Sequence, residues 1–493
     1  MTKIKQFIKK YEAMPVVARA SLWFVICGFM TRGVSLLTTP IFTRLLTTEQ
    51  YGVYSVFNSW LEIVTIFASL KLGYGVYIQG LVKFNDDQDR FSSSLLGLAT
   101  TWCGGAFLIY LLFHKTFNSL LGLETPMMVC MFVMVISTVA LDFWSARKRN
   151  EFKYATLVKV TMFIVVMKPL LGIIAVLLTN DAYKVEVRIV TLALVELVVG
   201  IILYVQIMSR GHEFYNKKYW KYALLFNLPL VPHFLSQVIL NHSDRIMIQK
   251  MVGASAAGVY SLAYSMAMIL SMINTSILQA IRPWVFQRIK VGEKEKIQPV
   301  VVSAILVVAF CNIMLISFAP ELVAIFAPGS YSGAIGLMPP ITLAVLFAFL
   351  YNLFVDIEMY FEKTKSVMNI AIVCAAINLI TNYFGIKWFG YAAAAYTTLA
   401  CYILMAILHY CSMEIMLRKN NIEGKIYDAK IIVAISLVYV LIGTVMGVLS
   451  CSLILRLIVM AILVVVLYLN RSRFTQIITL IRNKKKPTLH DKI

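Results

Sequence analysis

Charged residues are scarce in this chain of 493 residues: they make up 14% of the sequence, while hydrophobic residues make up 60%. Soluble domains carry roughly 25% charged and 45–50% apolar residues, so a single soluble core cannot bury this much apolar surface. Acidic residues are rarer than basic ones: there are 24 Asp and Glu against 45 Lys and Arg, which gives a formal net charge of +21. The composition therefore argues against a cytosolic enzyme and indicates a membrane protein.

Motifs for metal, nucleotide and covalent chemistry are also missing. The eight cysteines are scattered, mostly through apolar runs, without a CxxC pair or a paired-histidine spacing, so neither a zinc site nor a disulfide framework is expected. The sequence has no phosphate-binding P-loop, no HExxH and no nucleophile elbow. We therefore expect no cofactor and no enzymatic activity.

The sequence does contain apolar runs about 20 residues long, the length that crosses ~30 Å of hydrocarbon. The connections between them are short, and no soluble domain fits between them. These runs predict an all-α integral membrane protein with about fourteen transmembrane helices. We place the helices near 16–43, 52–78, 92–113, 125–146, 155–178, 187–208, 221–249, 256–281, 299–320, 334–356, 367–388, 390–413, 429–449 and 451–470.

The positions of Lys and Arg predict the orientation, because basic residues that flank a span stay on the cytoplasmic side. With the N-terminus inside, 32 of the 45 basic residues fall on the cytoplasmic face and 6 on the opposite face. Both termini are therefore expected in the cytoplasm, and the positive charge needs no nucleic-acid partner. The cluster RNKKK at 482–486 is expected to act as an inside anchor, with attraction to anionic lipid as the alternative.

A short repeat indicates an internal duplication. Gly-Val-Tyr-Ser occurs at 52–55 and again at 258–261, and each copy opens the span that follows a short outside loop. Because six spans separate the copies, they insert the same way up, which predicts two six-helix bundles related by a pseudo-two-fold axis along the membrane normal. The predicted domains are 1–215 with the N-terminal tail, 216–415, and 416–493 with the last two helices and a basic tail.

Two stretches resemble polysaccharide-unit flippases of the multidrug/oligosaccharidyl-lipid/polysaccharide exporter superfamily. They are TRGVSLLTTPIFTRLLTTEQYGVYSVFNSW and FNLPLVPHFLSQVILNHSDRIMIQKMVGASAAGVYSLAY, and Arg282-Pro283-Trp284 follows the second. The resemblance implies movement of an undecaprenyl-diphosphate-linked oligosaccharide from the inner to the outer leaflet of a bacterial inner membrane during surface polysaccharide assembly, as for the O-antigen of lipopolysaccharide. Lipid-linked oligosaccharide, membrane lipids and other assembly proteins are the implied partners.

Ionised side chains inside the bilayer are costly and usually face a cavity or a partner. Counted along their spans, Arg32, Glu62, Lys168 and Glu196 lie at similar depth, ~13–17 Å from the outer end at 1.5 Å per residue. Two interpretations stay open. In the first, Arg32 pairs with Glu62 and Lys168 with Glu196, and the pairs only hold helices together.

In the second interpretation, Arg32, Lys168, Lys71 and Lys159 line a cavity that attracts a diphosphate. Glu62 or Glu196, released from its basic partner, then binds a proton and couples transport to a proton gradient. Without a nucleotide site, the energy has to come from an ion gradient, the membrane potential or product removal. Asp142 either pairs with Lys159 or reaches toward the inner surface.

Four prolines mark expected hinges for alternating access, because proline removes a helical hydrogen bond. They are Pro40, Pro169, Pro229 and Pro232, with a kink that only serves packing as the alternative. Asp244 and Arg245 are expected to form a local bridge that closes the outer face.

Two other functions compete with the flippase. A drug or organic-cation antiporter of the same superfamily would need a net acidic central cavity, whereas the charged layer is balanced and the inner half of the first bundle is basic. A polysaccharide polymerase would need large catalytic outer loops, but the longest outer connection, near 321–333, has one acid and no base.

Overall fold

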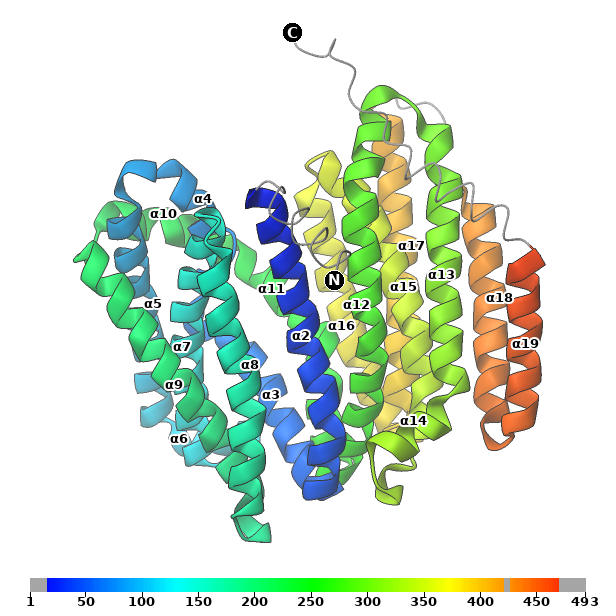
Figure 1. Cartoon of the computed structure of the whole chain (residues 1–493), viewed down its shortest axis with the longest axis horizontal. Coiled ribbons are helices and arrows are strands. Elements are labelled where there is room, and N and C mark those ends of the chain that lie inside the picture. The colour runs from blue at the N-terminus through cyan, green and yellow to red at the C-terminus, as the bar shows by residue number, and fades with distance from the viewer. Residues whose placement is uncertain (1–15, 421–425, 470–493) are drawn as a thin grey trace, which may run out of the picture. The chain divides into compact units, whose positions relative to one another are not determined.

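The computed structural model describes residues 16–420 and 426–469, and these residues form helices without any β-strand (Figure 1). The expected N-terminal tail and the basic cluster at 482–486 lie outside the described residues. The long helices are α2 (Val16–Leu45), α3 (Thr48–Ser69), α5 (Gln88–Leu112), α7 (Thr125–Asn150), α8 (Tyr154–Leu177), α9 (Lys184–Gly211), α11 (Val231–Met251), α12 (Ala254–Val291), α13 (Ile297–Ser317), α15 (Ala334–Tyr360), α16 (Thr364–Phe389), α17 (Ala393–Lys419), α18 (Ala429–Val448) and α19 (Leu453–Leu469). The shorter ones are α4 (Val76–Lys83), α6 (His114–Leu121), α10 (Lys217–Asn227) and α14 (Ala319–Phe326).

Eleven stretches of the described chain are long and apolar enough to cross a membrane. They coincide with eleven of the fourteen predicted spans. The other three predicted spans are also helical and correspond to α2, α3 and α19. α3 ends at Ser69, earlier than expected, and α19 is short, with an apolar segment from Leu453 to Val465. The prediction of an all-α integral membrane protein is confirmed.

The helices divide into two compact units, Met1–Ser261 and Leu262–Ile493. In the first unit, α7 and α8 both pack against α9, α2 packs against α8, and α3 packs against α11. Two buried apolar clusters fill it, one around Phe91 and Phe143 and the other around Phe57 and Met131. The domain limits expected from the repeat stay a prediction, because packing does not decide where a duplicated segment begins.

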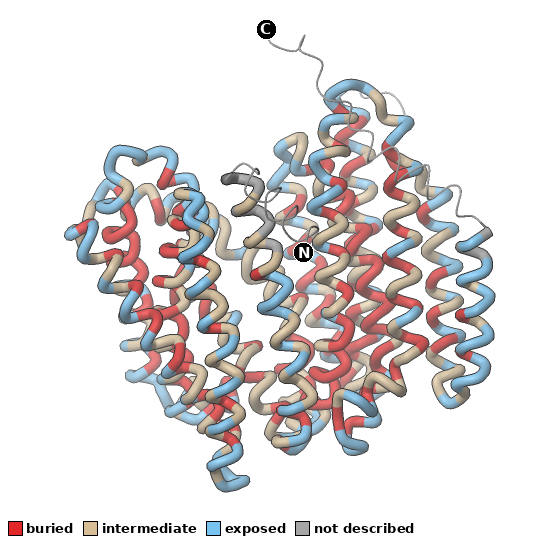
Figure 2. The backbone as a smooth tube through the Cα atoms, in the orientation of Figure 1, coloured by how far each residue is buried: buried red, intermediate tan, exposed pale blue. Residues whose placement is uncertain are grey.

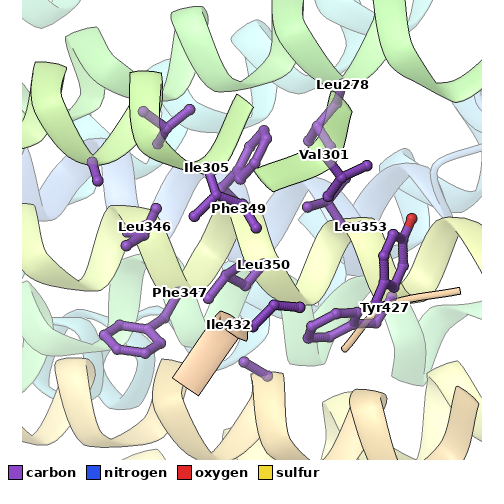
Figure 3. Packing of buried hydrophobic residues seen from close by; sticks show 14 of the residues in the cluster. Leu278, Val301, Ile305, Leu346, Phe347, Phe349, Leu350, Leu353, Tyr427 and Ile432 are labelled. Atoms are coloured by element: carbon purple, nitrogen blue, oxygen red, sulfur yellow. The ribbon is translucent and has the colours of Figure 1, made fainter. Parts of the chain in front are cut away.

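In the second unit, α15 is the central helix. It packs against α13, α17 and α18, and α16 packs against α17. α15 is buried along most of its length, whereas α19 is largely exposed (Figure 2). The α15 side chains Phe349, Leu350 and Leu353 contribute to an apolar cluster with Ile305 of α13 and Tyr427 (Figure 3). A chain that folds in lipid relies on such close packing between helices rather than on exclusion of water.

The two Gly-Val-Tyr-Ser copies contact each other inside the first unit. A Cβ atom on Gly52 would lie 1.8 Å from the carbonyl oxygen of Ala254, and one on Gly258 would lie 2.1 Å from that of Thr48. Three residues further along each copy, the Ser55 hydroxyl group donates to the Ser261 hydroxyl group at 2.6 Å. Equivalent residues of the repeat therefore meet one another where α3 crosses α12, and only glycine permits the backbones to approach so closely.

One of the long predicted spans is interrupted. The span at 52–78 breaks after α3, and the chain makes a turn before α4 begins at Val76. Leu70 and Lys71 have φ values of 51° and 48°, the left-handed region that costs non-glycine residues about 1 kcal/mol or more. The turn contains Gly73 and Gly75, which give the backbone conformational freedom. It contains no proline.

The span at 221–249 is broken where its prolines predict. α10 ends at Asn227, a short 3₁₀ turn (Leu228–Leu230) contains Pro229, and α11 starts at Val231 with Pro232 in its first turn. Proline is tolerated in a first turn because the N–H group there has no helical acceptor. The first unit therefore contains two interrupted spans, α3/α4 and α10/α11.

Candidate functional site

Lys168 and Glu196 form an ion pair between α8 and α9. The Lys168 side chain is 27% exposed and that of Glu196 is 12% exposed, so the ammonium group is not sealed off by its partner. Pro169 follows Lys168 inside α8 and cannot donate a hydrogen bond to the backbone, which leaves a carbonyl group of the preceding turn without its helical donor. The structure thus brings together this pair, as the first interpretation of the sequence expected.

Glu62 has a different partner from the one expected in that interpretation. Its carboxylate lies 3.9 Å from the Lys71 ammonium group, with side-chain exposures of 49% and 30%. The expected pairing of Glu62 with Arg32 is wrong, because the turn after α3 brings Lys71 back toward Glu62. Asp142 of α7 joins this group: a Cβ atom on Gly73 would lie 2.8 Å from its Cβ atom, and its carboxylate interacts electrostatically with Lys71.

Arg32 and Lys159 stand apart from these pairs. Both are exposed, Arg32 on α2 and Lys159 on α8, and neither has an ion-pair partner among the described residues. The expected alternative of an Asp142–Lys159 pair is therefore wrong. Because α2 packs against α8, Arg32 and the lysines of α8 belong to neighbouring helices.

The break after α3 is held in place by a residue that the sequence analysis missed. Asn227, fully buried at the end of α10, donates a side-chain hydrogen bond to the carbonyl group of Leu70. Tyr74 in the turn contacts Phe234 of α11 edge to face, with 5.7 Å between ring centroids. The two interrupted spans are therefore joined at their breaks, and Lys71 lies in that junction. No local signal reveals this contact, because 157 residues separate Asn227 from Leu70.

The other two predicted hinges lie within continuous helices. α2 runs through Pro40 and α8 runs through Pro169, so neither proline ends a helix. The Thr43 hydroxyl group and the Arg44 guanidinium group both donate to the carbonyl group of Pro40, at 3.2 and 2.9 Å. A role of these prolines in motion stays a prediction.

Asp244 and Arg245 are both buried on α11. The Asp244 carboxylate accepts a hydrogen bond from the Tyr260 hydroxyl group at 2.6 Å. The Arg245 guanidinium group donates to the carbonyl group of Asn241 at 3.0 Å and contacts the His242 ring. Asp244 therefore ties α11 to α12, and a direct bridge between the two residues stays a prediction.

A polar cavity of about 620 Å³ opens at one end of the first unit, among the connection before α5 and the ends of α7 and α9. Three arginines and four carboxylates line it, so its charged side chains carry a slight negative excess and it offers no strong anion site. Its charged lining residues are Asp86, Asp87, Asp89, Arg90, Arg147, Arg210 and Glu213, with His212 beside them. This end carries the loops that the Lys and Arg distribution assigns to the cytoplasm.

Beside this cavity, the loop after α7 carries a charge cluster centred on Glu151. Its carboxylate contacts Arg147 at 2.8 Å, Lys153 at 3.0 Å and Lys148 at 3.2 Å. Burial opposes ionisation of Glu151, but the hydrogen bonds from Arg147, Lys153 and Lys148 outweigh it and lower the pKa of Glu151 to about 2. This cluster fixes the end of α7, because three cations converge on one carboxylate.

The described residues contain no group of three or more His, Cys, Asp or Glu side chains that could hold a metal ion. What the first unit offers is a set of cations on α2, on α8 and in the turn after α3, two of them paired with carboxylates that an anionic ligand can replace. Such an arrangement can bind and release a phosphate group, since phosphate oxygens and carboxylates compete for the same donors.

Comparison with known proteins agrees with this architecture. The family model described as polysaccharide biosynthesis protein matches residues 17–289, more than half of the chain, and the MatE model matches residues 229–384. No curated protein sequence matches the chain.

Three solved structures share the fold. An inward-facing multidrug resistance MATE family transporter of the MOP superfamily has a TM-score of 0.60 and 12% identity, covering 80% of this chain and 96% of its own. The lipid II flippase MurJ, in an inward closed conformation, has a TM-score of 0.58 and 15% identity, covering 89% and 100%. A point mutant of the Vibrio cholerae MATE transporter VcmN has a TM-score of 0.53 and 11% identity, covering 83% and 97%. The fold is thus shared with MATE transporters and a lipid II flippase, and the chain belongs to the polysaccharide biosynthesis protein family.

Proposed function

We propose that this protein is a flippase that moves an undecaprenyl-diphosphate-linked oligosaccharide across a bacterial inner membrane for surface polysaccharide assembly, including O-antigen. The observation that carries the proposal is the family match over residues 17–289. The fold shared with a solved lipid II flippase supports it, because that protein also acts on a lipid-linked substrate. Membrane lipids and other polysaccharide assembly proteins are the proposed partners.

The cations of the first unit suit the diphosphate of such a substrate. Lys168 and Lys71 keep about a quarter to a third of their side-chain surface exposed while paired with Glu196 and Glu62. Arg32 is exposed without a carboxylate partner among the described residues. A diphosphate binds to such groups through charge-assisted hydrogen bonds and displaces the weaker carboxylate partners. In this proposal Lys159 makes a further contact during entry.

Displacement of a carboxylate gives the proposed cycle its coupling step. Once the diphosphate occupies Lys168 or Lys71, the released Glu196 or Glu62 loses its cation and binds a proton more readily. Asp142, close to Lys71, is affected in the same way. We place the bending that accompanies alternating access at Pro229 and Pro232, with Pro40 and Pro169 as secondary flexible points, and Asp244 and Arg245 close the outer side.

The test is export of surface polysaccharide in a strain that lacks the gene. Arg32→Ala and Lys168→Ala are each expected to abolish export while the amount of protein in the membrane stays unchanged. Lys115→Ala, which removes an exposed cation of α6, is the matched control and keeps wild-type export. If both site variants export at the wild-type level, the proposed cationic site is wrong.

A drug or organic-cation antiporter is the second candidate. The MatE match over residues 229–384 and the MATE transporter structures favour it. The same deletion strain separates the two, because an antiporter restores resistance to a cationic dye such as ethidium, whereas the flippase restores polysaccharide. Restored dye resistance without restored polysaccharide would overturn the proposed substrate.

A further inference from the structure

The second unit contains a buried charged pair outside the proposed substrate site. Glu358 lies near the end of α15 and His409 on α17, and neither side chain has any exposed surface. The His409 Nδ1 atom lies 2.6 Å from the Glu358 Oε2 atom, a short distance typical of a charge-assisted hydrogen bond. The other carboxylate oxygen, Oε1, accepts a hydrogen bond from the Ser412 hydroxyl group. Both carboxylate oxygens are therefore engaged inside the protein.

The two carboxylate oxygens determine how many protons the pair holds. His409 Nε2 is buried and has no hydrogen-bond partner within the described ranges, so the ring hydrogen is placed on Nδ1, which donates to Oε2. With the carboxylate ionised and hydrogen only on Nδ1, the pair carries one negative charge. One further proton on Oε1, the oxygen that faces Ser412, makes the pair a neutral carboxylic acid with a neutral imidazole, while Nδ1 keeps its hydrogen bond to Oε2.

Among the described residues, no other charged side chain is paired with Glu358 or His409. Asp356, on the same helix, is paired with Arg282 of α12 at 2.7 Å. On α17, Glu414 interacts with Tyr410. The Tyr351 ring stacks on the His409 ring with 5.9 Å between centroids, and it contributes no charge.

The neighbouring helices supply little charge of their own. α13 has no charged residue, α18 has only Lys430 in its first turn, and α16 has Lys365 and Lys387 near its two ends. Lys365 is exposed, as is Lys363 in the connection before α16. A negative charge on the pair is therefore held in a low-dielectric interior without a compensating cation, which is costly.

A chain of hydroxyl groups leads from this pair toward the end of the helices. Ser412 lies 2.7 Å from the Ser366 hydroxyl group, in the first turn of α16. Ser366 is only half-buried and is flanked by exposed residues of the connection before α16. Hydroxyl groups both donate and accept, so Ser366 and Ser412 form a hydrogen-bonded route from the surface to the Glu358 carboxylate.

We propose that Glu358 and His409 form a second proton-binding site, in the second unit and loaded through Ser366 and Ser412, which is required together with Glu196 or Glu62 to couple transport to the proton gradient. The coupling, but not the proton site itself, rests on the proposed function. The empty pair holds a buried negative charge, whereas the loaded pair is neutral and its Oε1–H group donates to the Ser412 hydroxyl group, which reverses that hydrogen bond. The two states therefore favour different surroundings of the Glu358 carboxylate, and a conformation that keeps the carboxylate buried is stabilised by proton binding.

The first experiment measures proton binding without any substrate. Infrared difference spectra of the purified full-length protein are recorded between about pH 8 and about pH 5, the range in which histidine-containing sites exchange protons. Glu358→Gln and His409→Gln are each expected to lose the bands of the pair. Glu321→Gln is the control, because the Arg456 guanidinium group beside Glu321 lowers the pKa of that carboxyl group and keeps it ionised in this range.

The second experiment measures coupling in proteoliposomes with a fluorescent undecaprenyl-diphosphate-linked N-acetylglucosamine as the probe. Translocation by the wild type is expected to be faster with a pH gradient than without it. Glu358→Gln is expected to retain gradient-free translocation and to lose the acceleration. Should Glu358→Gln fail to fold, Ser412→Ala is used instead. It keeps the pair but removes a hydroxyl group of the route, so we expect the infrared response after a pH jump to be slower than in the wild type.

Wild-type difference spectra and undiminished acceleration in both Glu358→Gln and His409→Gln would overturn the proposal. Loss of the bands together with loss of the acceleration supports it. If the wild-type protein does not move the probe, but Glu358→Gln still loses the bands, the proton site stands and the proposed function fails.

Discussion

At the scale of single residues, variants of Lys168 and Glu196 can distinguish a structural role of this ion pair from a role in substrate binding. The two side chains are largely buried, so removal of one leaves the other unpaired in a poorly solvated place. Glu196→Gln is expected to lower the free energy of unfolding by about 1–3 kcal/mol. Thermal denaturation of the purified protein in detergent measures this loss.

The double variant Lys168→Met with Glu196→Leu removes both partners of the pair at once. Because it removes both charges and keeps apolar volume, we expect it to recover most of the lost stability. Export of polysaccharide is expected to stay absent, since the cation proposed to bind the diphosphate is gone. Wild-type export by the double variant would show that the pair has only a structural role.

Glu151 makes a pH-dependent contribution to stability. Its pKa is lowered to about 2 in the folded protein, against about 4.3 for an unperturbed glutamate. The stabilisation is therefore complete above the unfolded value and disappears as the pH falls from about 5 toward 2. We expect a loss of about 1–2 kcal/mol after allowance for solvent screening. Melting temperatures measured over this range should fall less in Glu151→Gln than in the wild type.

Sequence reasoning at this scale placed most of the charged side chains on the right helices, Lys71 being in a turn instead, but paired only some of them correctly. The first of the two interpretations paired Lys168 with Glu196, since they occupy similar depths in adjacent spans, and the two side chains do meet. It also paired Glu62 with Arg32, yet Glu62 lies beside Lys71. Depth along a helix can be counted from the sequence, whereas the rotation of each helix about its axis depends on packing that the sequence does not display.

At the scale of elements, the crossing of α3 and α12 depends on two glycines of the repeat. Gly52→Ala places a Cβ atom 1.8 Å from the carbonyl oxygen of Ala254, so the helices have to separate. We expect a loss of at least about 1–3 kcal/mol, the usual range for an overpacked contact. Gly105→Ala in α5, where a Cβ atom meets no atom within 4 Å, is the control and is expected to be neutral or stabilising. Equal melting temperatures for the two variants would contradict the close crossing.

The junction of the two interrupted spans gives a second prediction for the elements. Asn227→Ala removes the hydrogen bond to the Leu70 carbonyl group and leaves that buried acceptor unpaired, at a cost of about 1–3 kcal/mol. Because Leu70 and Lys71 already hold unfavourable backbone angles, the turn is expected to open locally. Hydrogen exchange should therefore rise at residues 70–75 more than in α3. Unchanged exchange there would show that the turn does not depend on Asn227.

The two interruptions show which parts of the elements a sequence reveals. The break at Pro229 was predicted, because proline cannot donate a helical hydrogen bond. The break after Ser69 was not, because glycine is tolerated inside membrane helices and the turn is stabilised by Asn227 from a distant segment. The long helices themselves were predictable, since each needs only an apolar run of sufficient length.

At the scale of the whole molecule, the distribution of Lys and Arg predicts the orientation in the membrane, on which the direction of transport depends. With both termini in the cytoplasm, the connection between α18 and α19 faces outward. It contains Cys451, which is exposed, and Asn150 at the end of α7 is exposed on the predicted cytoplasmic side. A membrane-impermeant maleimide added to intact spheroplasts is expected to label Cys451 in a Cys411→Ser background.

In a background that carries Cys411→Ser and Cys451→Ser, an Asn150→Cys variant is expected to react with the maleimide only after the membrane is permeabilised. The physical reason is the 32 to 6 ratio of basic residues on the two faces, because each exposed cation resists transfer across the membrane during insertion. A C-terminal fluorescent fusion checks the tail independently, since it should fluoresce only when the tail is cytoplasmic. Labelling of Asn150→Cys in intact spheroplasts would show that the topology is the inverse of the predicted one. The Glu151 cluster and the cavity beside it would then lie on the face where a flippase releases its substrate.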